Sequence, residues 1–386
     1  MQAKGWMMPV LRKVDVTEIS DSSAINRLKG DWELLLATYG TPSFFLSWLW
    51  IGNWIDILPA NACLYRVTVY CGGRPEALAI VTRQKIKRNG LFSSNVLALN
   101  ESLLAGFDMV VEYNGLVGNT ENRDVVTLML SGLKEQLGDW DELRVSAVCN
   151  ENLLLNDCVL KDQILSPRLV ADSDSRYVDL ASIREKQCSY ISMLSKNTRY
   201  NIRRYLRAIE RHGQIGVSVP MSVDEALIYF DVLKSYHQAY WLQRGEPGSF
   251  ANPVWEGFHR NIIRQGFEYG AIQLLKINVG DETVGVVYSL VSSGTVNMVQ
   301  SGYNYNLFRR QRPGYVCLTK AIEYNLNAGN NVFDLLVGDA QYKKSLATDT
   351  VKLKWVMLQR RRVKLSIENF IRALKHKIMG DSDFSI

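Results

Sequence analysis

Two distant segments of the chain share one pattern of strand, glycine turn and strand, and this repetition limits the folds available to it. In the first segment, residues 64–70 are rich in β-branched and aromatic residues, residues 72–75 form a turn, and a second strand follows. A segment that starts at Ile272 matches this pattern, with Gly280 in the position of Gly72. In each half, two predicted helices precede the hairpin, and a helix and a strand follow it. The pattern indicates either an α/β unit that is used twice or a chance match between two ordinary hairpins.

Length and composition are typical of a folded protein with two domains. The 386 residues exceed the ~250–300 that one hydrophobic core serves well. Hydrophobic residues make up 47% of the chain and charged residues 22%, which excludes the disordered and fibrous classes. No run of ~18 apolar residues could span a bilayer, and the first residues lack the apolar stretch of a signal peptide. The six cysteines form no CxxC pair, so we expect reduced thiols and a cytoplasmic protein.

The predicted elements give an α/β fold in which helices precede antiparallel strands in each half. In the first half we expect helices over 31–39, 44–58 and 124–137, and strands over 64–70, 76–82, 96–99 and 143–148. In the second half we expect helices over 187–212, 224–243, 254–265, 314–327 and 367–378, and strands over 271–279, 283–292, 295–303, 332–337 and 352–361. Residues 166–175, with Ser-Pro and Asp-Ser-Asp-Ser, are predicted to connect the halves. The expected domains are 1–175 and 176–365, followed by a basic amphipathic helix and tail over 366–386.

Positive charge is concentrated in two segments. The chain has 45 Lys and Arg against 39 Asp and Glu, a net charge of +6. Residues 352–377 hold nine of these basic residues against one acid, Glu368, and residues 196–211 hold six against Glu210. Such segments indicate a polyanionic ligand, such as phosphates or RNA, or an anionic membrane surface. The alternative is that each is the solvated face of a surface element.

A basic loop ends at Gly314, between a predicted strand and a predicted helix. Glycine lets a backbone approach a ligand closely, and the first turn of a helix offers free N–H groups, a combination suited to phosphate or pyrophosphate. An ordinary basic turn before a helix is the competing interpretation. In the helix predicted over 187–212, Ile202 and Ile209 belong to a core-facing stripe, beside which Arg203 and Arg207 form a basic flank.

Metal binding has little support. The four histidines are scattered, without an HxxxH or Cys/His cluster, so we expect no metal site. Walker, Rossmann and GxSxG motifs are missing as well.

The second half resembles the GNAT-superfamily acetyltransferases of the CelD-like type, which are associated with cellulose and exopolysaccharide operons and related to the FemAB peptidyltransferases. The resemblance lies in an ordered set of segments: Tyr177-Val-Asp-Leu, Leu194-Ser-Lys-Asn-Thr-Arg-Tyr-Asn, His237-Gln-Ala-Tyr-Trp-Leu-Gln-Arg-Gly-Glu-Pro-Gly, Phe258-His, Arg312-Pro-Gly-Tyr and Phe333-Asp-Leu-Leu-Val-Gly-Asp-Ala-Gln-Tyr-Lys-Lys. The first half is similar more loosely, through Phe44-Phe-Leu-Ser-Trp-Leu-Trp and Glu112-Tyr-Asn-Gly. The resemblance implies two GNAT-like units in tandem, each a mixed, largely antiparallel sheet flanked by helices.

In that superfamily, the pyrophosphate of an acyl-CoA lies on backbone N–H groups of an (Arg/Gln)-x-x-Gly-x-(Gly/Ala) loop that opens a helix. Gln311-Arg-Pro-Gly-Tyr-Val keeps the first two anchors of this loop, whereas Val316 occupies the last small position and Pro313 removes one donor N–H. The resemblance thus implies that acetyl-CoA or another acyl-CoA binds in the second half only. The implied cofactor-binding residues are Gln311, Arg312, Gly314, Tyr315 and Lys343.

Acyl transfer by direct attack needs a base for the acceptor and a proton donor for the leaving thiolate. Asp339 is the predicted base and Tyr342 the predicted proton donor, because both follow the strand over 332–337. The alternative is a structural role, in which Asp339 is a turn residue and Lys343 is part of a surface ion pair. His237, Trp241 and Arg244, spaced at i, i+4 and i+7, are predicted to line the acceptor pocket, although Trp241 could equally belong to the core.

The leading functional hypothesis is an acyl-CoA-dependent N- or O-acyltransferase that acts on a sugar or amine acceptor in bacterial polysaccharide or cell-envelope biosynthesis. A second hypothesis is a FemAB-like transferase that uses aminoacyl-tRNA, whose backbone the basic segments would contact. The chain lacks the long coiled-coil arm of several such enzymes, which favours the first hypothesis. A third is a GNAT scaffold that binds a partner or an anionic membrane through 352–377, in a cytoplasmic protein peripheral to the inner membrane.

Overall fold

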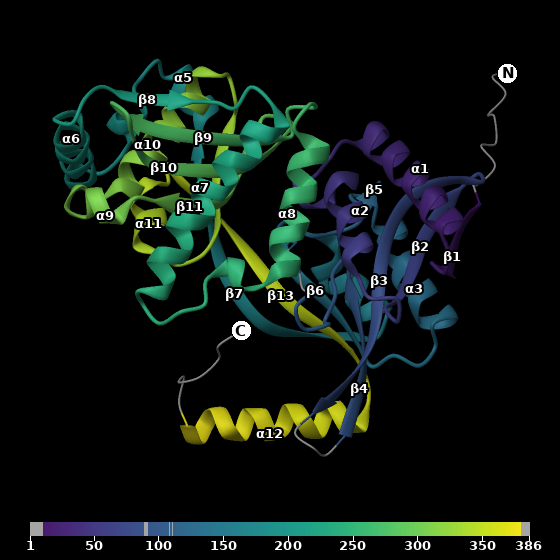
Figure 1. Cartoon of the computed structure of the whole chain (residues 1–386). Coiled ribbons are helices and arrows are strands. Elements are labelled where there is room, and N and C mark those ends of the chain that lie inside the picture. The colour runs from purple at the N-terminus through teal and green to yellow at the C-terminus, as the bar shows by residue number, and fades with distance from the viewer. Residues whose placement is uncertain (1–10, 89–91, 108, 110, 380–386) are drawn as a thin grey trace, which may run out of the picture.

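The computed structural model describes residues 11–88, 92–107, 109 and 111–379 (Figure 1). Its strands are β1 (Arg12–Glu18), β2 (Cys63–Cys71), β3 (Arg74–Arg88), β4 (Phe92–Leu99), β5 (Val117–Gly118), β6 (Glu142–Cys149), β7 (Leu165–Asp179), β8 (Ile215–Ser218), β9 (Ile272–Val279), β10 (Glu282–Ser292), β11 (Thr295–Tyr303), β12 (Val332–Val337) and β13 (Asp349–Arg360). Its α-helices are α1 (Ser22–Tyr39), α2 (Trp48–Ile57), α3 (Arg123–Gln136), α4 (Asp157–Asp162), α5 (Leu180–Glu185), α6 (Lys196–Glu210), α7 (Val223–Leu242), α8 (Pro253–Gly266), α9 (Tyr305–Phe308), α10 (Pro313–Asn327), α11 (Gln341–Leu346) and α12 (Val363–Met379).

One continuous sheet joins the two halves of the described chain. It has 13 strands in the order β1-β2-β3-β4-β6-β13-β7-β12-β11-β10-β9-β8, with β5 beside β3. Within it the same unit occurs twice: a strand, two helices, three antiparallel strands, a helix and a parallel strand. The first unit runs from β1 to β6 and the second from β8 to β12. The parallel pairs β4–β6 and β11–β12 hold equivalent places. The predicted mixed, largely antiparallel sheet built from two units is thus confirmed.

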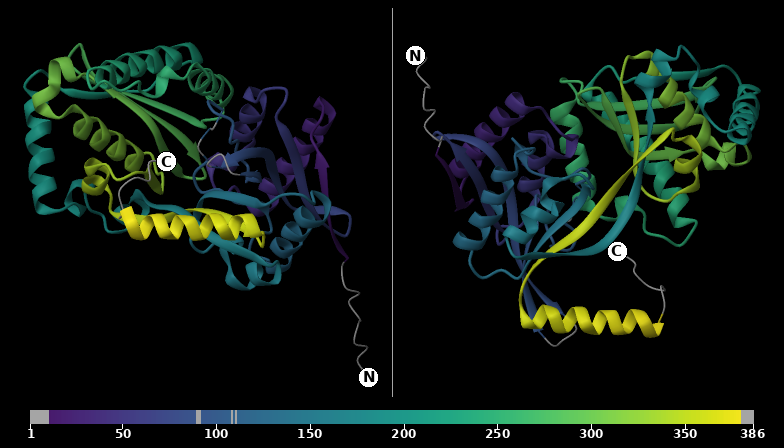
Figure 2. Two further views of the ribbon diagram at one scale, coloured as in Figure 1. Left: turned by 90° about the horizontal axis from the view of Figure 1, so that it is seen from below. Right: turned by 180° about the vertical axis from the view of Figure 1, so that it is seen from behind.

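A long two-stranded ribbon, β7 with β13, connects the units (Figure 2). β13 pairs with β6 of the first unit, and β7 pairs with β12 of the second. Residues 166–175, predicted to connect the halves, form most of β7 and so connect them as a strand and not as a turn. Much of β7 is exposed or half-exposed, so its sequence lacks the apolar alternation that identifies a strand. The proposed boundary at 175 falls inside this strand.

Four helices differ from prediction at their starts. The helix predicted over 31–39 is α1, which begins at Ser22 because the Asp21 side chain accepts the Ala24 N–H, and the helix predicted over 44–58 is a 3₁₀ turn followed by α2. The helix predicted over 187–212 is α5, a short 3₁₀ turn and then α6, which begins after Ser195 because the Ser195 hydroxyl accepts the Thr198 N–H. The terminal helix, predicted from 367, begins at Val363. The remaining strands of the second half lie within a few residues of their predicted bounds.

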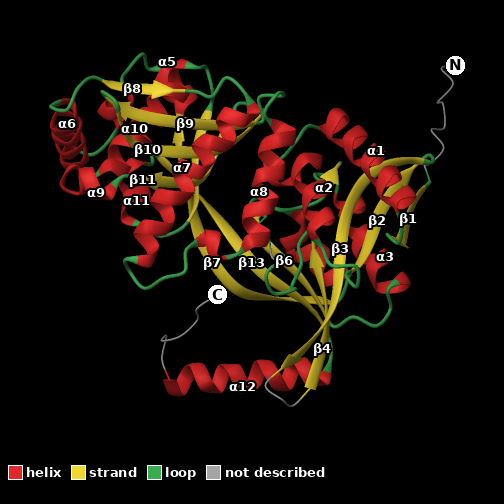
Figure 3. Ribbon diagram, viewed as in Figure 1, coloured by secondary structure: helices red, strands yellow, loops and turns green. Residues whose placement is uncertain are grey.

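The two faces of the second unit carry different helices. Val286 and Tyr288 of β10 pack in one core with α7 and α8, whereas Val287, between them, packs in another with α6 and α10. Alternate residues of a strand point to opposite faces, so β10 is covered on both sides. The units meet where α2 packs on α8 (Figure 3). There the ring centroids of Trp50 and Phe258 lie 4.8 Å apart. Among the described residues, no helix is both apolar and long enough to cross a bilayer.

Candidate active site

The strands β11 and β12 separate at the end where α10 begins. Their parallel pairing runs from Thr295 and Val332 to Asn297 and Asp334, and the rest of β11 pairs with β10. A bulge interrupts β12 after Asp334, where Leu336 has φ +61° and donates its N–H to Asp334 Oδ1 at 2.7 Å. The ends of the two strands are therefore free of each other, as a ligand that inserts between them requires.

The first turn of α10 lies at this end of β11. Arg312 takes a left-handed conformation (φ 51°, ψ 62°), Pro313 occupies the first helical position, and no side chain caps the helix. Proline is well suited to this position because its fixed φ matches the helix. Tyr315 donates its N–H to Arg312 O at 3.0 Å, whereas no hydrogen bond among the described residues uses the Gly314 N–H. Val316 is fully buried, so its bulk lies in the core and does not obstruct the turn.

Gly314 lies close to the ring of Tyr303. A Cβ at this position would lie 3.0 Å from Tyr303 Cε2. The equivalent helix of the first unit differs, because Asn122 caps α3 by accepting the Asp124 N–H, and Asp124 adds an acid to the first turn. A phosphate would thus meet a capped, acidic helix in the first unit and an uncapped one in the second.

Several arginines surround the first turn of α10. Arg309, Arg310 and Arg312 are exposed, and the ion pairs of the described residues do not include them. From α6, the Arg204 guanidinium lies 5.2 Å from the ring centroid of Tyr205, which in turn lies 5.8 Å from that of Tyr315. Gln311 is half-buried in the same loop. The predicted phosphate-binding residues therefore form a basic surface together with α6.

Three tyrosines connect this turn to α11. Burial and the neighbouring Tyr305 raise the pKa of Tyr342 to about 12. Burial also raises the pKa of Tyr305 to about 12. Burial and the neighbouring Tyr342 raise the pKa of Tyr303. Because Tyr303 is the side chain against Gly314, Tyr342 and the α10 turn share a neighbour. Tyr342 is protonated at neutral pH and can donate a proton.

Two of the predicted acceptor residues lie on α7 and Arg244 lies just after it, and Tyr240 connects Trp241 and Arg244 to Tyr305. Tyr240 stacks on Tyr305 with ring centroids 4.8 Å apart, and the Arg244 guanidinium lies 4.3 Å from the Tyr240 ring. Trp241 is 36% exposed and contacts His237. His237 is buried, with Nδ1 3.4 Å from Ser301 O and Nε2 accepting the Ser249 N–H, and burial lowers its pKa.

Asp339 and Lys343 occupy other environments than predicted. The Asp339 side chain is 78% exposed and forms ion pairs with Arg176 and Lys344. The Asp339 carboxylate therefore lies largely in solvent. Lys343 is half-buried, and its ammonium donates to Leu336 O at 3.1 Å and Val337 O at 2.6 Å, so it holds the bulge of β12. Burial lowers the pKa of Lys343.

A buried acidic cluster, formed by Glu112 and Tyr113 of the first unit with Asp334 and Ser175, lies at this bulge. Glu112 Oε2 accepts the Val337 N–H at 2.9 Å. Tyr113 donates to an Asp334 oxygen, and Ser175 Oγ lies 3.1 Å from Asp334 Oδ1. Burial, with Asp334 nearby, raises the pKa of Glu112 to about 7, and burial raises that of Asp334. Glu112 can therefore exchange a proton near neutral pH.

Sequence reasoning missed the role of this cluster, although it noted Glu112 and Asp334 in the family-like segments. Their partners come from opposite units, and spacing along one segment cannot reveal such a contact. Tyr113 and Asp334 also line a cavity of about 350 Å³ between the units, which Phe44, Tyr177 and Asn297 help to form.

Comparisons with known proteins agree with this geometry. Residues 196–344 match the family model of the acetyltransferase (GNAT) domain. The crystal structure of FemX has a TM-score of 0.60 and 9% identity, over 92% of this chain and 99% of that one. A conserved protein of unknown function from Bacteroides thetaiotaomicron VPI-5482 gives a TM-score of 0.55 and 8% identity, over 90% and 100%. L-PGS from Bacillus licheniformis gives 0.50 and 12%, over 89% and 96%.

At these identities the solved structures indicate a shared fold only, and no curated protein matches the chain significantly. The family model covers the segment from α6 to α11, which contains the separation of β11 and β12, the first turn of α10 and Tyr342. The chain is therefore an acyltransferase that carries a GNAT-type acetyltransferase domain in its second half.

Proposed function

We propose that the chain transfers an acyl group from an acyl-CoA, such as acetyl-CoA, to an amine or hydroxyl of a sugar or amine acceptor. One observation supports this proposal most strongly. Tyr303, at the end where β11 and β12 separate, is a neighbour both of the uncapped first turn of α10 and of Tyr342. The thioester would lie between the strand ends, with the CoA phosphates at Gly314 and the surrounding arginines. A pyrophosphate at a helix N-terminus gains both N–H groups and the helix dipole.

The reaction needs one proton removed and one delivered. The nitrogen or oxygen of the acceptor attacks the thioester carbonyl carbon, a new C–N or C–O bond forms, and the C–S bond breaks. Glu112 takes the proton that the acceptor loses, and Tyr342 gives its proton to the leaving thiolate. Glu112 replaces Asp339 in this scheme because the pKa of about 7 suits a base at neutral pH. Lys343 positions the β12 bulge beside Glu112 and does not contact phosphate.

A second candidate donor is aminoacyl-tRNA. The exposed arginines on α6, Arg203, Arg204 and Arg207, extend the basic surface beyond what one pyrophosphate needs. This extension favours a longer phosphate backbone, and its binding would weaken steeply with salt. The CelD-like subtype, a place in polysaccharide or cell-envelope synthesis and a cytoplasmic location peripheral to the inner membrane remain parts of the proposal.

Binding experiments separate the two donors. Mass spectrometry of the purified protein would detect CoA that co-purifies, and titrations would compare acetyl-CoA, longer acyl-CoA and charged tRNA. We expect acyl-CoA to bind and Arg312→Ala to weaken it. If charged tRNA binds and acyl-CoA does not, the donor is aminoacyl-tRNA. If neither binds, both proposed donors are refuted.

A further inference from the structure

The C-terminal helix α12 carries four large apolar side chains on its exposed side, whereas Leu365 is buried. Val363, Ile367, Phe370 and Leu374 are 78%, 52%, 65% and 43% exposed. Their spacing of four, three and four residues places them in one line along the helix. We call these four residues the apolar stripe of α12.

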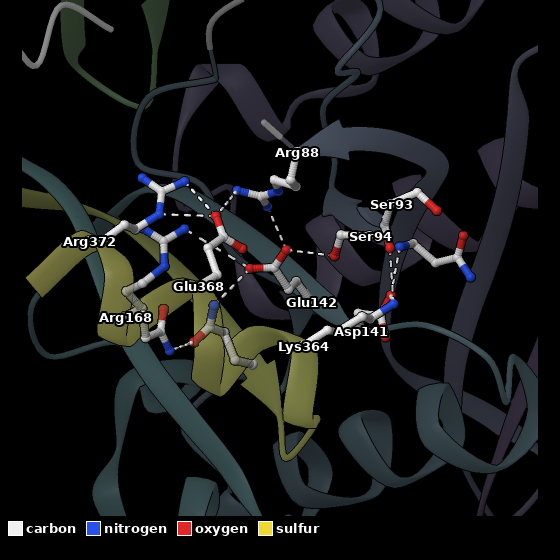
Figure 4. Close-up of polar contacts among 12 residues, drawn as sticks. Arg88, Ser93, Ser94, Asp141, Glu142, Arg168, Lys364, Glu368 and Arg372 are labelled. Atoms are coloured by element: carbon white, nitrogen blue, oxygen red, sulfur yellow. Dashed lines mark hydrogen bonds and ion pairs between the residues drawn. The ribbon is translucent and has the colours of Figure 1, made fainter. Parts of the chain in front are cut away.

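The opposite side of α12 is polar and faces the protein, as Figure 4 shows. Glu368, with a side chain 4% exposed, accepts from Arg372 at 2.6 Å and lies 3.4 Å from Arg88. Lys364 Nζ lies 2.6 Å from Asp141 Oδ2. The inner side of α12 is thus held mainly by polar and charged contacts, together with the buried Leu365.

A second buried carboxylate anchors the base of this network. Glu142 has a fully buried side chain, pairs with Arg88, and accepts from Ser94 at 2.7 Å and from Gln359 at 2.9 Å. Gln359 in turn accepts from Asn369 of α12 at 2.8 Å. These contacts lie on one side of α12 and set its rotation about its own axis. The apolar stripe cannot turn inward without leaving buried charges unpaired, which proteins strongly disfavour.

Some of the basic residues near the stripe carry charge that no acid of the described residues pairs. Of the nine Lys and Arg in 352–377, four form ion pairs with carboxylates, namely Lys352, Arg362, Lys364 and Arg372. Arg361 is exposed just before the helix, and Lys85 and Lys87 are exposed on the part of β3 that leads to Arg88. Figure 1 shows α12 apart from the helices of both units, beside β4.

This combination favours an anionic lipid surface over a second copy of the chain. Two copies joined through their stripes would bring two basic surrounds together, and like charges repel. An anionic membrane suits both the apolar stripe and the basic residues. The stripe can insert among the lipid acyl chains, and the anionic headgroups attract Lys and Arg. An exposed aliphatic and aromatic line with basic flanks is the arrangement of helices that lie in the plane of a membrane surface.

We propose that α12 docks the protein onto an anionic membrane surface, with the apolar stripe at the level of the acyl chains. The stripe is held outward by the ion pairs around Glu368 and Glu142. This proposal does not rest on the donor or the acceptor of the acyl transfer, and its test uses no activity measurement.

The test is co-sedimentation of the full chain with vesicles of phosphatidylcholine, with and without about one third phosphatidylglycerol. We expect binding to the anionic vesicles that weakens with salt, and at least roughly tenfold weaker binding of an Ile367→Gln, Phe370→Gln double variant. Ile228→Gln on α7, an equally exposed isoleucine outside the stripe, is the matched control and should bind like wild type.

Light scattering and circular dichroism complete the test. Both glutamine variants change exposed residues, so their circular dichroism should equal that of wild type. Equal vesicle binding by wild type and the stripe variant would overturn the proposal. So would a wild-type dimer that ignores vesicles and becomes monomeric in the stripe variant, because the stripe would then belong to a contact between copies.

Discussion

Replacing Glu112 by Gln removes a base and leaves the shape of the site. The amide keeps the size of the carboxyl, and its oxygen can still accept the Val337 N–H that Glu112 Oε2 accepts at 2.9 Å. Loss of general-base catalysis costs about 10²–10⁴ in rate, so we expect kcat to fall by that range. Acyl-CoA affinity should hardly change, since the α10 turn is untouched.

The pH dependence separates a base from a structural residue. With a pKa of about 7, Glu112 should give wild-type kcat/KM a limb that falls on the acid side of neutrality and is lost in Glu112→Gln. The same pKa lies above the ordinary 4.5, so the folded state holds this proton more tightly than the unfolded chain. Stability from this group is present at low pH and is lost as pH rises through about 7, by about 3 kcal/mol.

The assays are a pH–rate profile and denaturant unfolding at pH 5 and pH 8. Relative to wild type, Glu112→Gln should lose less stability between these two pH values. Asp339→Asn is the matched control, because the Asp339 side chain is 78% exposed and should leave kcat near wild type. An acid limb and a kcat that both survive in Glu112→Gln would refute the assignment of the base.

Gly314→Val should weaken acyl-CoA binding about tenfold or more and leave the circular dichroism unchanged. The valine side chain would block the phosphate from the Gly314 N–H, and a hydrogen bond to a charged group is worth about 1.5–3 kcal/mol. Normal affinity in calorimetry would mean that the phosphates bind elsewhere. Tyr342→Phe should lower kcat by about 10²-fold without altering acyl-CoA affinity, and an unchanged kcat would remove Tyr342 as proton donor. Arg244→Ala should raise the KM for the acceptor. An unchanged KM would mean that the acceptor binds elsewhere, for example in the cavity beside Tyr113. Arg88→Met should cost about 3 kcal/mol in unfolding experiments, because two buried carboxylates lose a partner, and a cost near zero would contradict the anchoring of α12.

The repeated hairpin was the most informative feature of the sequence. The predicted strands over 271–279, 283–292 and 295–303 match β9, β10 and β11 within a residue. Alternating apolar residues, glycine turns and cap residues are local signals, so they could be recognised without knowing the rest of the chain. The turn before α10 was likewise predicted from adjacent residues, and Pro313 and Val316 fit it, whereas its binding of acyl-CoA stays a prediction.

Features that depend on contacts between distant parts of the chain could not be predicted from the sequence. Residues 166–175 form a strand because β13, far along the chain, pairs with them, and their polar composition reflects an exposed ribbon. Glu112 is buried against Val337 of the other unit, and its raised pKa arises from that burial. The prediction of Asp339 rested on its position after β12, which places a residue along the chain but does not tell whether its side chain is buried.

Amide hydrogen exchange of the full chain tests most directly whether the second unit binds the acyl donor at the first turn of α10. Exchange is measured with and without saturating acetyl-CoA, and α3 of the first unit serves as the internal reference because Asn122 already caps it. We expect slower exchange over residues 311–316 and no change in the first turn of α3. Protection at α3 instead, or no protection at 311–316 under saturation, would contradict binding at the first turn of α10.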